Sequence, residues 1–283
     1  MCGIVGLFLK DENLKSSLGD FLTQMLSTLG DRGPDSSGIA IYNDSAQERY
    51  KLTIMSKNPD FDFNAVKKGL EKRLGQTINI NPRHNHAVLH LAEKELKIAL
   101  EQITIHHPDV RIMSKGRRIE IYKEVGLPEE VTTQFQISGM SGSHGLGHTR
   151  MATESKVTTF GAHPFSTGFD QCLVHNGSLS NHNALRRKLS RHGIQVETEN
   201  DTEVAAAYLT WKMDQGLSLK EALEESLNDL DGFFTFLVGT KTGFGVLRDP
   251  IACKPAVMAE TNQYVAFGSE YRAFAKLPDI SSA

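Results

Sequence analysis

The sequence lacks a hydrophobic run long enough to cross a lipid bilayer, and it lacks a large excess of either charge. None of its apolar segments approaches the roughly 20 residues that a membrane-spanning helix needs. Its net charge of −3 leaves no basic excess to neutralise phosphates, so neither a membrane nor a nucleic acid is an expected partner. Small molecules and other proteins are the expected partners.

Cysteine is also scarce, since the chain has only Cys2, Cys172 and Cys253. Three widely separated cysteines with no secretory segment before them argue against a disulfide framework and indicate a reducing cytoplasm. The histidines of the 84–90 segment have no cysteine or carboxylate at the spacing that a metal site requires. We therefore predict no metal site.

The 283 residues, 39% of them hydrophobic, are enough for one large domain with an insertion. Short apolar runs bounded by glycine predict buried strands, at 4–9, 38–42, 145–151, 171–175, 233–239, 243–248 and 264–268. Amphipathic patterns predict helices at 18–29, 184–192, 202–215 and 219–230, with capping residues Ser218 and Glu221 before the last. Because the helices form two clusters separated by strands, an α+β layered sandwich is favoured over a βαβ repeat.

The segment from about 56 to 140 has a different character and is predicted to be an insertion forming a small α/β lobe. Charged helical patterns lie around 66–74 and 93–101. A hairpin is predicted at 110–125, with its turn at Lys115 and Gly116.

The first residues hold a candidate nucleophile. If Met1 is removed, Cys2 carries a thiol and an α-amine on one residue, and the ordinary pKa of an α-amine, about 7.7 to 8.0, suits a base for a thiol of about 8.5. Cys2 can equally be a small hydrophobic residue opening an edge strand.

Three later segments hold candidate binding residues, each with a simpler explanation. Arg150 ends a strand and has the planar fork that suits a carboxylate, but such an arginine is more often a surface residue. Asn176 and Gly177 could supply two donors to an oxyanion, or simply form a turn. Asp201 could receive an ammonium group, or cap a helix.

Taken together and in order, these segments resemble the class II glutamine amidotransferases, which are N-terminal-nucleophile hydrolases. The resemblance rests on the sequences Cys-Gly-Ile-Val-Gly at 2–6, Arg-Gly-Pro-Asp at 32–35, Gly-His-Thr-Arg at 147–150, His-Asn-Gly at 175–177 and Asp-Thr-Glu at 201–203. It implies a four-layer αββα sandwich across residues 1–283, interrupted by the insertion.

The resemblance also implies a role for each residue. Cys2 would attack the glutamine carboxamide, with its own α-amine as base, to give a γ-glutamyl thioester and ammonia. Asn176 and Gly177 would form the oxyanion hole. Arg150 and Asp201 would hold the α-carboxylate and the α-ammonium, and Thr153 would add a hydrogen bond to the same carboxylate.

Two positions depart from the pattern of some relatives. Met151 stands where an aromatic residue follows the arginine, and Glu154 stands where a histidine follows the threonine. The loop over the substrate is therefore expected to differ.

The chain has no phosphate-binding glycine loop and no cysteine set for an iron–sulfur cluster, so no cofactor is expected in it. It resembles the small amidotransferase subunits of glutamate-synthase-like complexes, including N-methylglutamate synthase of methylamine metabolism. This resemblance implies a cytoplasmic hetero-oligomer. Its partners would be a synthase subunit holding FMN and an iron–sulfur cluster, reached through an ammonia channel, and a subunit with a β-helical domain.

Two alternatives stay open. Retention of Met1 would convert the base amine into an amide and leave a structural or regulatory subunit without catalysis. A free-standing hydrolase of another amide is the second alternative, although Arg150 and Asp201 favour an α-amino-acid substrate.

Overall fold

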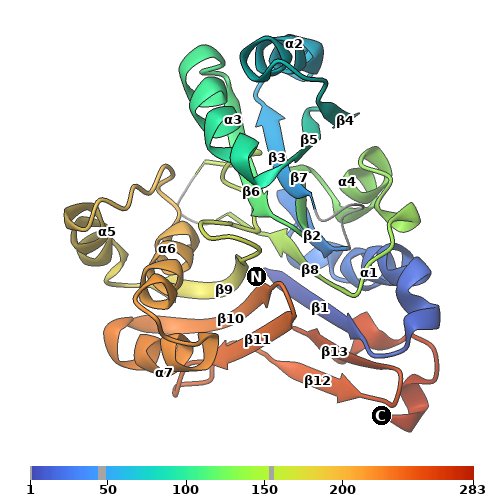
Figure 1. The fold of residues 1–283 in the computed structure, drawn as a ribbon. Coiled ribbons are helices and arrows are strands. Elements are labelled where there is room, and N and C mark those ends of the chain that lie inside the picture. Colours follow the sequence, from blue (N-terminus) through green and yellow to red (C-terminus); the bar gives the residue numbers. More distant parts are fainter. Residues whose placement is uncertain (1, 44–48, 153–155) are drawn as a thin grey trace.

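The computed structural model describes residues 2–43, 49–152 and 156–283 and has four layers, with two antiparallel sheets between outer helices (Figure 1). The larger sheet has six strands in the order β12-β13-β1-β8-β2-β7, and the smaller has three in the order β11-β10-β9. This is the predicted αββα sandwich, so the α+β fold class is confirmed.

The six-stranded sheet consists of β1 (Gly3–Leu9), β2 (Ser36–Tyr42), β7 (Ile119–Val125), β8 (His144–Arg150), β12 (Val257–Glu260) and β13 (Tyr264–Gly268). The three-stranded sheet consists of β9 (Cys172–Leu179), β10 (Gly232–Thr240) and β11 (Gly243–Arg248). The outer helices are α1 (Leu18–Ser27) and α4 (Pro128–Gln134) on one side, and α5 (His182–Arg191), α6 (Asp201–Asp214) and α7 (Leu219–Asp229) on the other. The seven predicted strands are all present, whereas β12 was not predicted.

Alternation along β1 shows how the layers are held together. Val5, Leu7 and Leu9 pack with the buried residues of α1, while Ile4 packs toward the second sheet, in a cluster with Leu237 of β10. Successive side chains of a strand point to opposite faces. Because both faces of β1 are apolar and covered, this strand lies in the interior of the sandwich.

The cap predicted for α7 is present, and α6 has a cap as well, formed by Asn200. Ser218 and Glu221 form a capping box at the start of α7. At the start of α6, the Asn200 side chain accepts a hydrogen bond from the Thr202 N–H. These caps fix the first turns of the helices, and in α6 that turn holds Asp201.

The inserted lobe has a sheet of its own, made of β3 (Tyr50–Ser56), β4 (Asn79–Arg83), β5 (His86–Leu91) and β6 (Val110–Gly116). Helices α2 (Phe63–Leu74) and α3 (Glu93–His106) connect these strands, giving βαββαβ. The strand order is β4-β5-β3-β6 with antiparallel neighbours, which is the ferredoxin-like arrangement. Both helices pack on one face of this sheet and leave the other face toward the main body.

The predicted hairpin at 110–125 is wrong, although both of its strands exist. β6 pairs with β3 in the lobe, whereas β7 pairs with β2 in the main sheet. At the junction, the Asp170 carboxylate accepts hydrogen bonds from the backbone N–H groups of Arg117, Arg118 and Ile119, at 2.9, 2.8 and 3.1 Å. The separate sheet thus ends at Gly116, within the predicted 56–140 insertion, and 119–134 returns to the main body.

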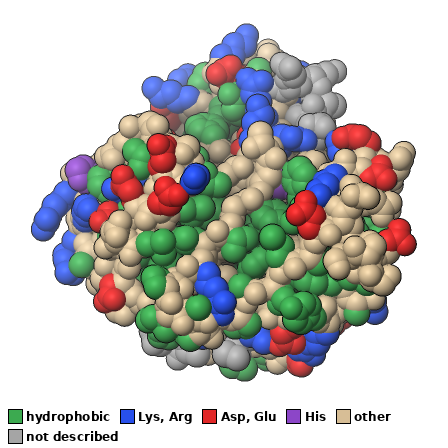
Figure 2. Space-filling model, turned by 90° about the horizontal axis from the view of Figure 1, so that it is seen from below, with side chains coloured by type: hydrophobic (Ala, Val, Ile, Leu, Met, Phe, Trp, Pro, Cys, Tyr) green, Lys and Arg blue, Asp and Glu red, His purple; other side chains and the backbone are tan. Residues whose placement is uncertain are grey.

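No helix in the described part of the chain is long and apolar enough to cross a membrane. β11 and β12 are the outer strands of their sheets and lie on the lower side of Figure 1. Seen from below, hydrophobic side chains gather on the surface (Figure 2). Met258 of β12 is 62% exposed, and Ile251, between β11 and β12, is 70% exposed.

Candidate active site around Cys2

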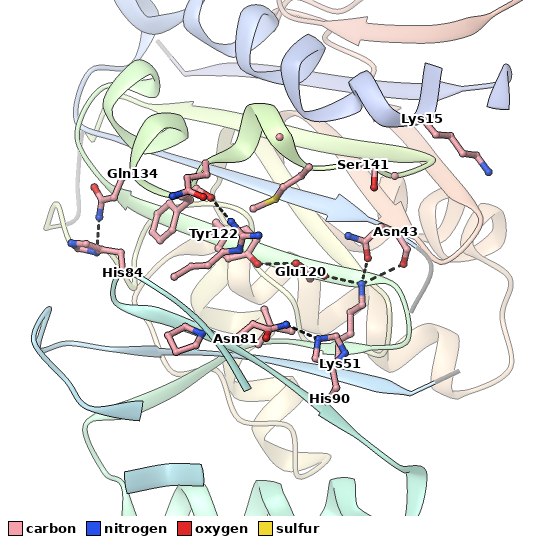
Figure 3. Close-up of a pocket in the computed structure, with 18 of the residues that line it drawn as sticks. Lys15, Asn43, Lys51, Asn81, His84, His90, Glu120, Tyr122, Gln134 and Ser141 are labelled. Atoms are coloured by element: carbon pink, nitrogen blue, oxygen red, sulfur yellow. Dashed lines mark hydrogen bonds and ion pairs between the residues drawn. The ribbon is translucent and has the colours of Figure 1, made fainter. Parts of the chain in front are cut away.

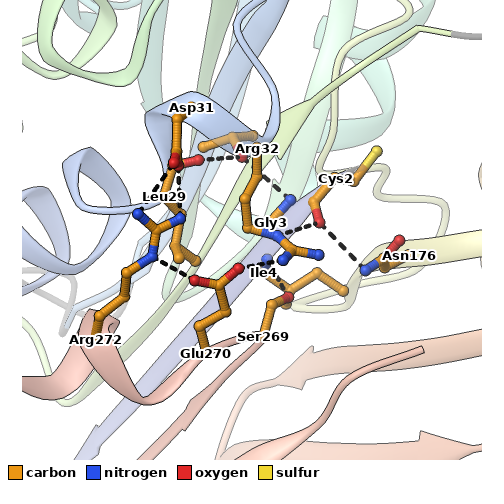
Figure 4. A network of polar contacts seen from close by, with 11 residues as sticks. Cys2, Gly3, Ile4, Leu29, Asp31, Arg32, Asn176, Ser269, Glu270 and Arg272 are labelled. Carbon is orange, nitrogen blue, oxygen red and sulfur yellow. Dashed lines mark hydrogen bonds and ion pairs between the residues drawn. The ribbon is translucent and has the colours of Figure 1, made fainter. Parts of the chain in front are cut away.

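Cys2 directly precedes β1, and hydrogen bonds from four separate segments hold the backbone at this point (Figure 4). Its carbonyl accepts from Arg32 Nε at 3.1 Å and from Asn176 Nδ2 at 3.2 Å. The next two N–H groups, of Gly3 and Ile4, donate to Thr149 Oγ1 at 3.1 Å and to Ser269 Oγ at 3.0 Å. The half-buried thiol lies 3.8 Å from the Met151 carbonyl. We call this region the Cys2 site.

An ion-pair network lies behind the Cys2 carbonyl (Figure 4). Arg32, with its side chain only 10% exposed, pairs with Glu270, and Glu270 also pairs with Arg272. Arg272 in turn makes a bidentate contact with Asp31, at 3.0 and 2.6 Å. Burial tends to raise the pKa of Glu270, but hydrogen bonds from the two arginines outweigh it and lower the pKa. Arg32 is thereby held against Cys2 by an ionised partner.

Asn176 and Gly177 lie on β9 next to the Cys2 backbone. The Asn176 amide nitrogen has two N–H donors, and the bond to the Cys2 carbonyl occupies one of them. Gly177 has a φ of +145°, and an added Cβ would lie 2.0 Å from the Phe233 carbonyl oxygen. Only glycine fits this backbone position.

Asp201 is the first residue of α6 and is bound to the end of β9. Its Oδ2 accepts from the Leu179 N–H at 2.9 Å, and its Oδ1 lies 3.7 Å from His175 Nδ1. Burial raises the pKa of Asp201, but His175 and the Leu179 N–H together lower it to about 2. The side chain keeps 22% of its surface exposed, so an ionised carboxylate is accessible there.

Arg150 is the last residue of β8 and is 5% exposed. The pairing of β1 with β8 places Gly3 opposite Thr149, so Arg150 follows beside Cys2. Asp35 fixes the chain that leaves this strand, because its N–H donates to the Arg150 carbonyl and its Oδ2 accepts from the Ala152 N–H at 2.7 Å. Gly33 passes so close that an added Cβ would lie 2.5 Å from the Arg150 nitrogen.

The structure therefore brings Asn176 into contact with Cys2, with Gly177 next to Asn176 on β9, and places Arg150 and Asp201 on the neighbouring strand end and helix start. Thr153 and Met1 lie outside the described residues. Among the residues that are described, no group of histidine, cysteine, aspartate or glutamate side chains is arranged to hold a metal ion.

Comparison with known proteins identifies the family. A model described as a glutamine amidotransferase domain matches residues 148–276. Over 283 residues, the chain is 60% identical to the glutamine amidotransferase-like protein GlxB of Rhizobium meliloti (strain 1021), covering 100% of this chain and 94% of that protein. The chain belongs to the glutamine amidotransferase family.

A second relative of the amidotransferase is more distant. The chain is 36% identical over 296 aligned residues to a putative glutamine amidotransferase of Methanothermobacter thermautotrophicus (strain Delta H), covering 99% of this chain and 95% of the relative. Among solved structures, glutamine phosphoribosylpyrophosphate amidotransferase from B. subtilis, complexed with ADP and GMP, aligns with a TM-score of 0.61 at 20% identity. That alignment covers 96% of this chain but 43% of the other, and it shows a shared fold.

Three buried histidines of the amidotransferase pack behind the Cys2 site. The rings of His148 and His163 stack with their centroids 4.0 Å apart. Thr202 Oγ1 lies 2.6 Å from His163 Nε2 and 3.0 Å from His175 Nδ1. Burial lowers the pKa of His148 to about 3 and that of His163 well below its usual value. These two rings are therefore neutral packing and hydrogen-bonding groups around the start of α6.

The segment that carries His163 is held by Lys123 of β7. The Lys123 ammonium donates to the carbonyls of Phe160, Ala162 and Pro164 at 3.1, 2.7 and 3.2 Å. Lys123 is 2% exposed, and its Nζ lies 4.4 Å from the centroid of the Phe165 ring. Burial lowers the pKa of Lys123 to about 7.

These supporting residues were not predicted from the sequence. Arg32 and Thr202 lay within motifs without a role of their own, and neither Glu270 nor Lys123 was singled out. The contact between Arg32 and Glu270 spans 238 residues, so no local spacing signals it. Lys123 does not stand out in the sequence, because β7 also contains Glu120 and Glu124.

Proposed function

We propose that this amidotransferase hydrolyses glutamine, with Cys2 as the nucleophile. The observation that supports it most strongly is the convergence of the Asn176 amide and the Arg32 guanidinium on the Cys2 carbonyl. This contact fixes the nucleophilic residue at the open end of β1, and it leaves a second Asn176 N–H donor available. A nucleophile beside a preorganised donor is the arrangement that acyl transfer requires.

In the proposed reaction, Met1 has been removed and the α-amine of Cys2 takes the thiol proton. The Cys2 sulfur then forms a bond to the glutamine Cδ, and the oxyanion receives hydrogen bonds from Asn176 Nδ2 and the Gly177 N–H. The C–N bond breaks as the protonated amine returns its proton to the leaving nitrogen, which departs as ammonia. Water then cleaves the γ-glutamyl thioester, releasing glutamate and restoring the thiol.

Substrate selection is proposed to depend on two charges. The Arg150 guanidinium would pair with the α-carboxylate of glutamine, and the Asp201 carboxylate, ionised at neutral pH, would pair with the α-ammonium. Thr153 is proposed to add a hydrogen bond to the carboxylate. An amide that lacks either charged group would leave one of these side chains unpaired, which disfavours its binding.

We further propose that the ammonia passes through a channel to a partner subunit of a cytoplasmic hetero-oligomer that resembles glutamate synthase or N-methylglutamate synthase. FMN and an iron–sulfur cluster would lie in the synthase partner, and another partner would carry the β-helical domain. The support is the sequence resemblance, together with the exposed apolar side chains at β11 and β12, since such patches often mark protein contacts. Glutamine-dependent product formation in the purified complex, compared with formation from free ammonia, tests this proposal.

The test of the glutaminase itself is intact-mass analysis of the purified protein with and without 6-diazo-5-oxo-norleucine, a reactive glutamine analogue. We expect a chain without Met1 and a single adduct on Cys2. Cys172 is a built-in negative control, because burial raises the pKa of its thiol to about 12. A chain that retains Met1 and takes up no adduct would reject the mechanism and favour a non-catalytic subunit.

A further inference from the structure

A second hollow lies away from Cys2, between the inserted lobe and the main body (Figure 3). Its volume is about 860 Å³, within the range of about 300 to 1,000 Å³ found for small-molecule sites. One wall is the helix-free face of the lobe's sheet, from β3, β4 and β5. The other wall comes from β7, the end of α4 and residues 139–143.

The lobe wall is polar, although it faces another layer of the protein. On β3 and β5, Leu52 and Leu89 turn toward α2 and α3. Toward the hollow, the same sheet presents Lys51, Asn81 and His90 (Figure 3). Arg83 lines the hollow as well. Two layers that simply pack together bury apolar faces, so this polar face needs another explanation.

The charges on the wall are unbalanced. Glu120 is the single carboxylate among the described residues that line the hollow. It is already occupied, because it pairs with Lys51 at 2.7 Å and accepts from the Tyr122 hydroxyl at 2.7 Å (Figure 3). Burial raises the pKa of Glu120, but Lys51, together with hydrogen bonds from Tyr122 and Asn43, outweighs it and lowers the pKa. This pair contributes no net charge.

Among the described lysine and arginine residues that line the hollow, Arg83 is the one with no carboxylate partner. Nη1 donates to the Phe135 carbonyl at 3.1 Å, and the guanidinium also donates to the Tyr122 side chain, which leaves other N–H donors of the five unused. Its Cζ lies 5.9 Å from the centroid of the Tyr122 ring. Lys15, on the opposite wall, pairs with Glu12, whose side chain is 79% exposed.

The tip of the β4–β5 hairpin closes one end of the hollow next to Arg83. His84 has a φ of +51°, a conformation uncommon for a residue with a side chain. Its ring nitrogen Nδ1 lies 2.6 Å from Gln134 Nε2 of α4 (Figure 3). The hairpin tip is thus attached to the opposite wall, and Arg83 is held at the side of a preformed hollow.

We propose that this hollow, the Arg83 cavity, binds a small organic anion whose carboxylate or phosphate pairs with Arg83. A guanidinium with unused donors in a concave polar wall is suited to either group. The site is independent of Cys2 and of the proposed glutaminase activity. It gives the inserted lobe a binding role of its own.

Binding is measured directly by isothermal titration of the whole protein, with inorganic phosphate, 2-oxoglutarate and AMP as probes. We expect saturable binding of at least one probe. Arg83→Gln should weaken it at least 10-fold, and Arg83→Lys, which keeps the charge, should weaken it less. Arg73→Gln is the matched control, because Arg73 is exposed on α2 of the same lobe, and it should bind as the parent protein does.

Arg150→Met tests whether the probe binds in this cavity or at the Cys2 site. We expect probe binding to be unchanged in this variant. The proposal is overturned if none of the three probes binds saturably to the parent protein. It is also overturned if Arg83→Gln, shown by circular dichroism to be folded, binds as well as the parent, or if Arg150→Met abolishes binding. These outcomes do not depend on whether the protein is an active glutaminase.

Discussion

The Cys2 site and the Arg83 cavity are both polar hollows of one chain, but they are built differently. At the Cys2 site, strand ends from two sheets and the start of a helix meet, and hydrogen bonds from four segments hold the backbone at Cys2. In the Arg83 cavity, polar side chains spread over one face of a sheet, and a guanidinium keeps unused donors. The first arrangement suits a reaction that needs fixed geometry, and the second suits reversible binding.

Cys2→Ala should separate the two regions most sharply. We expect glutaminase activity to fall by about 10⁴-fold or more, as for other lost nucleophiles, while anion binding in the Arg83 cavity stays unchanged. Ammonia release and isothermal titration on the same preparation measure both. Cys253→Ala, at an exposed cysteine, should alter neither. Substantial glutaminase activity in Cys2→Ala would contradict the assigned nucleophile.

Asn176→Ala tests the donor at the Cys2 site. Loss of an oxyanion donor lowers kcat by roughly 10²–10³, with little change in KM. Steady-state kinetics should show this split. Asn183→Ala, at an exposed position of α5, is the control. A rise in KM at constant kcat would instead assign Asn176 to substrate binding.

Asp201→Asn tests the charge that is proposed to hold the α-ammonium. Loss of a buried charge partner costs about 2 kcal/mol or more, or roughly 30-fold in kcat/KM. Asp214→Asn, at the exposed end of the same helix, should leave kcat/KM unchanged. Equal kinetics for the two variants would rule out the proposed role.

Asp201→Asn should also change how the free energy of unfolding depends on pH. The folded pKa of Asp201, about 2, lies below the ordinary value of 3.8, so its ionised form stabilises the folded state above about pH 4. This contribution to the free energy of unfolding is lost as the pH falls through about 2. Urea denaturation should therefore show parent and Asp201→Asn converging in acid.

Lys123→Met should have the smallest effect, because it acts on Cys2 only through the 160–164 segment. Removing three donors from buried carbonyls should cost about 1–3 kcal/mol of stability and raise KM for glutamine a few-fold. Lys97→Met, on the exposed face of α3, is the control. An unchanged KM would show that this segment does not position the substrate site.

Lys123 also predicts a pH dependence of stability. Its folded pKa of about 7 lies below the ordinary 10.5, so between these values the unfolded chain holds the extra proton. The free energy of unfolding of the parent, relative to Lys123→Met, should therefore rise with pH from about 7 toward 10. Denaturation at pH 7 and pH 9 measures the difference, and a falling trend would contradict it.

Most strands and helices of the fold were predictable from the sequence, but the sheet that each strand joins was not always predictable. β1, β8 and β9 were predictable because each is a short apolar run next to glycine, and Ser218 identified the start of α7. Periodicity cannot say which sheet a strand joins, so β6 and β7 were taken for one hairpin.

The candidate site was predictable where it coincides with motifs. Cys2, Arg150, Asn176, Gly177 and Asp201 fall within short segments that resemble a known family. The contacts that hold them join residues that are far apart in the sequence. Glu270 contacts Arg32 across 238 residues, and Ser269 contacts Ile4 across 265. No local pattern encodes such pairs.

Asp170 connects the inserted lobe to the segment that leads into the Cys2 site. Its carboxylate holds the junction at 117–119, where the lobe meets β7, and two residues later the chain enters β9, which carries Asn176. A displacement of the lobe at this junction would therefore be transmitted through Asp170 to the segment that leads into β9. The three hydrogen bonds link the base of the lobe directly to the chain that carries Asn176.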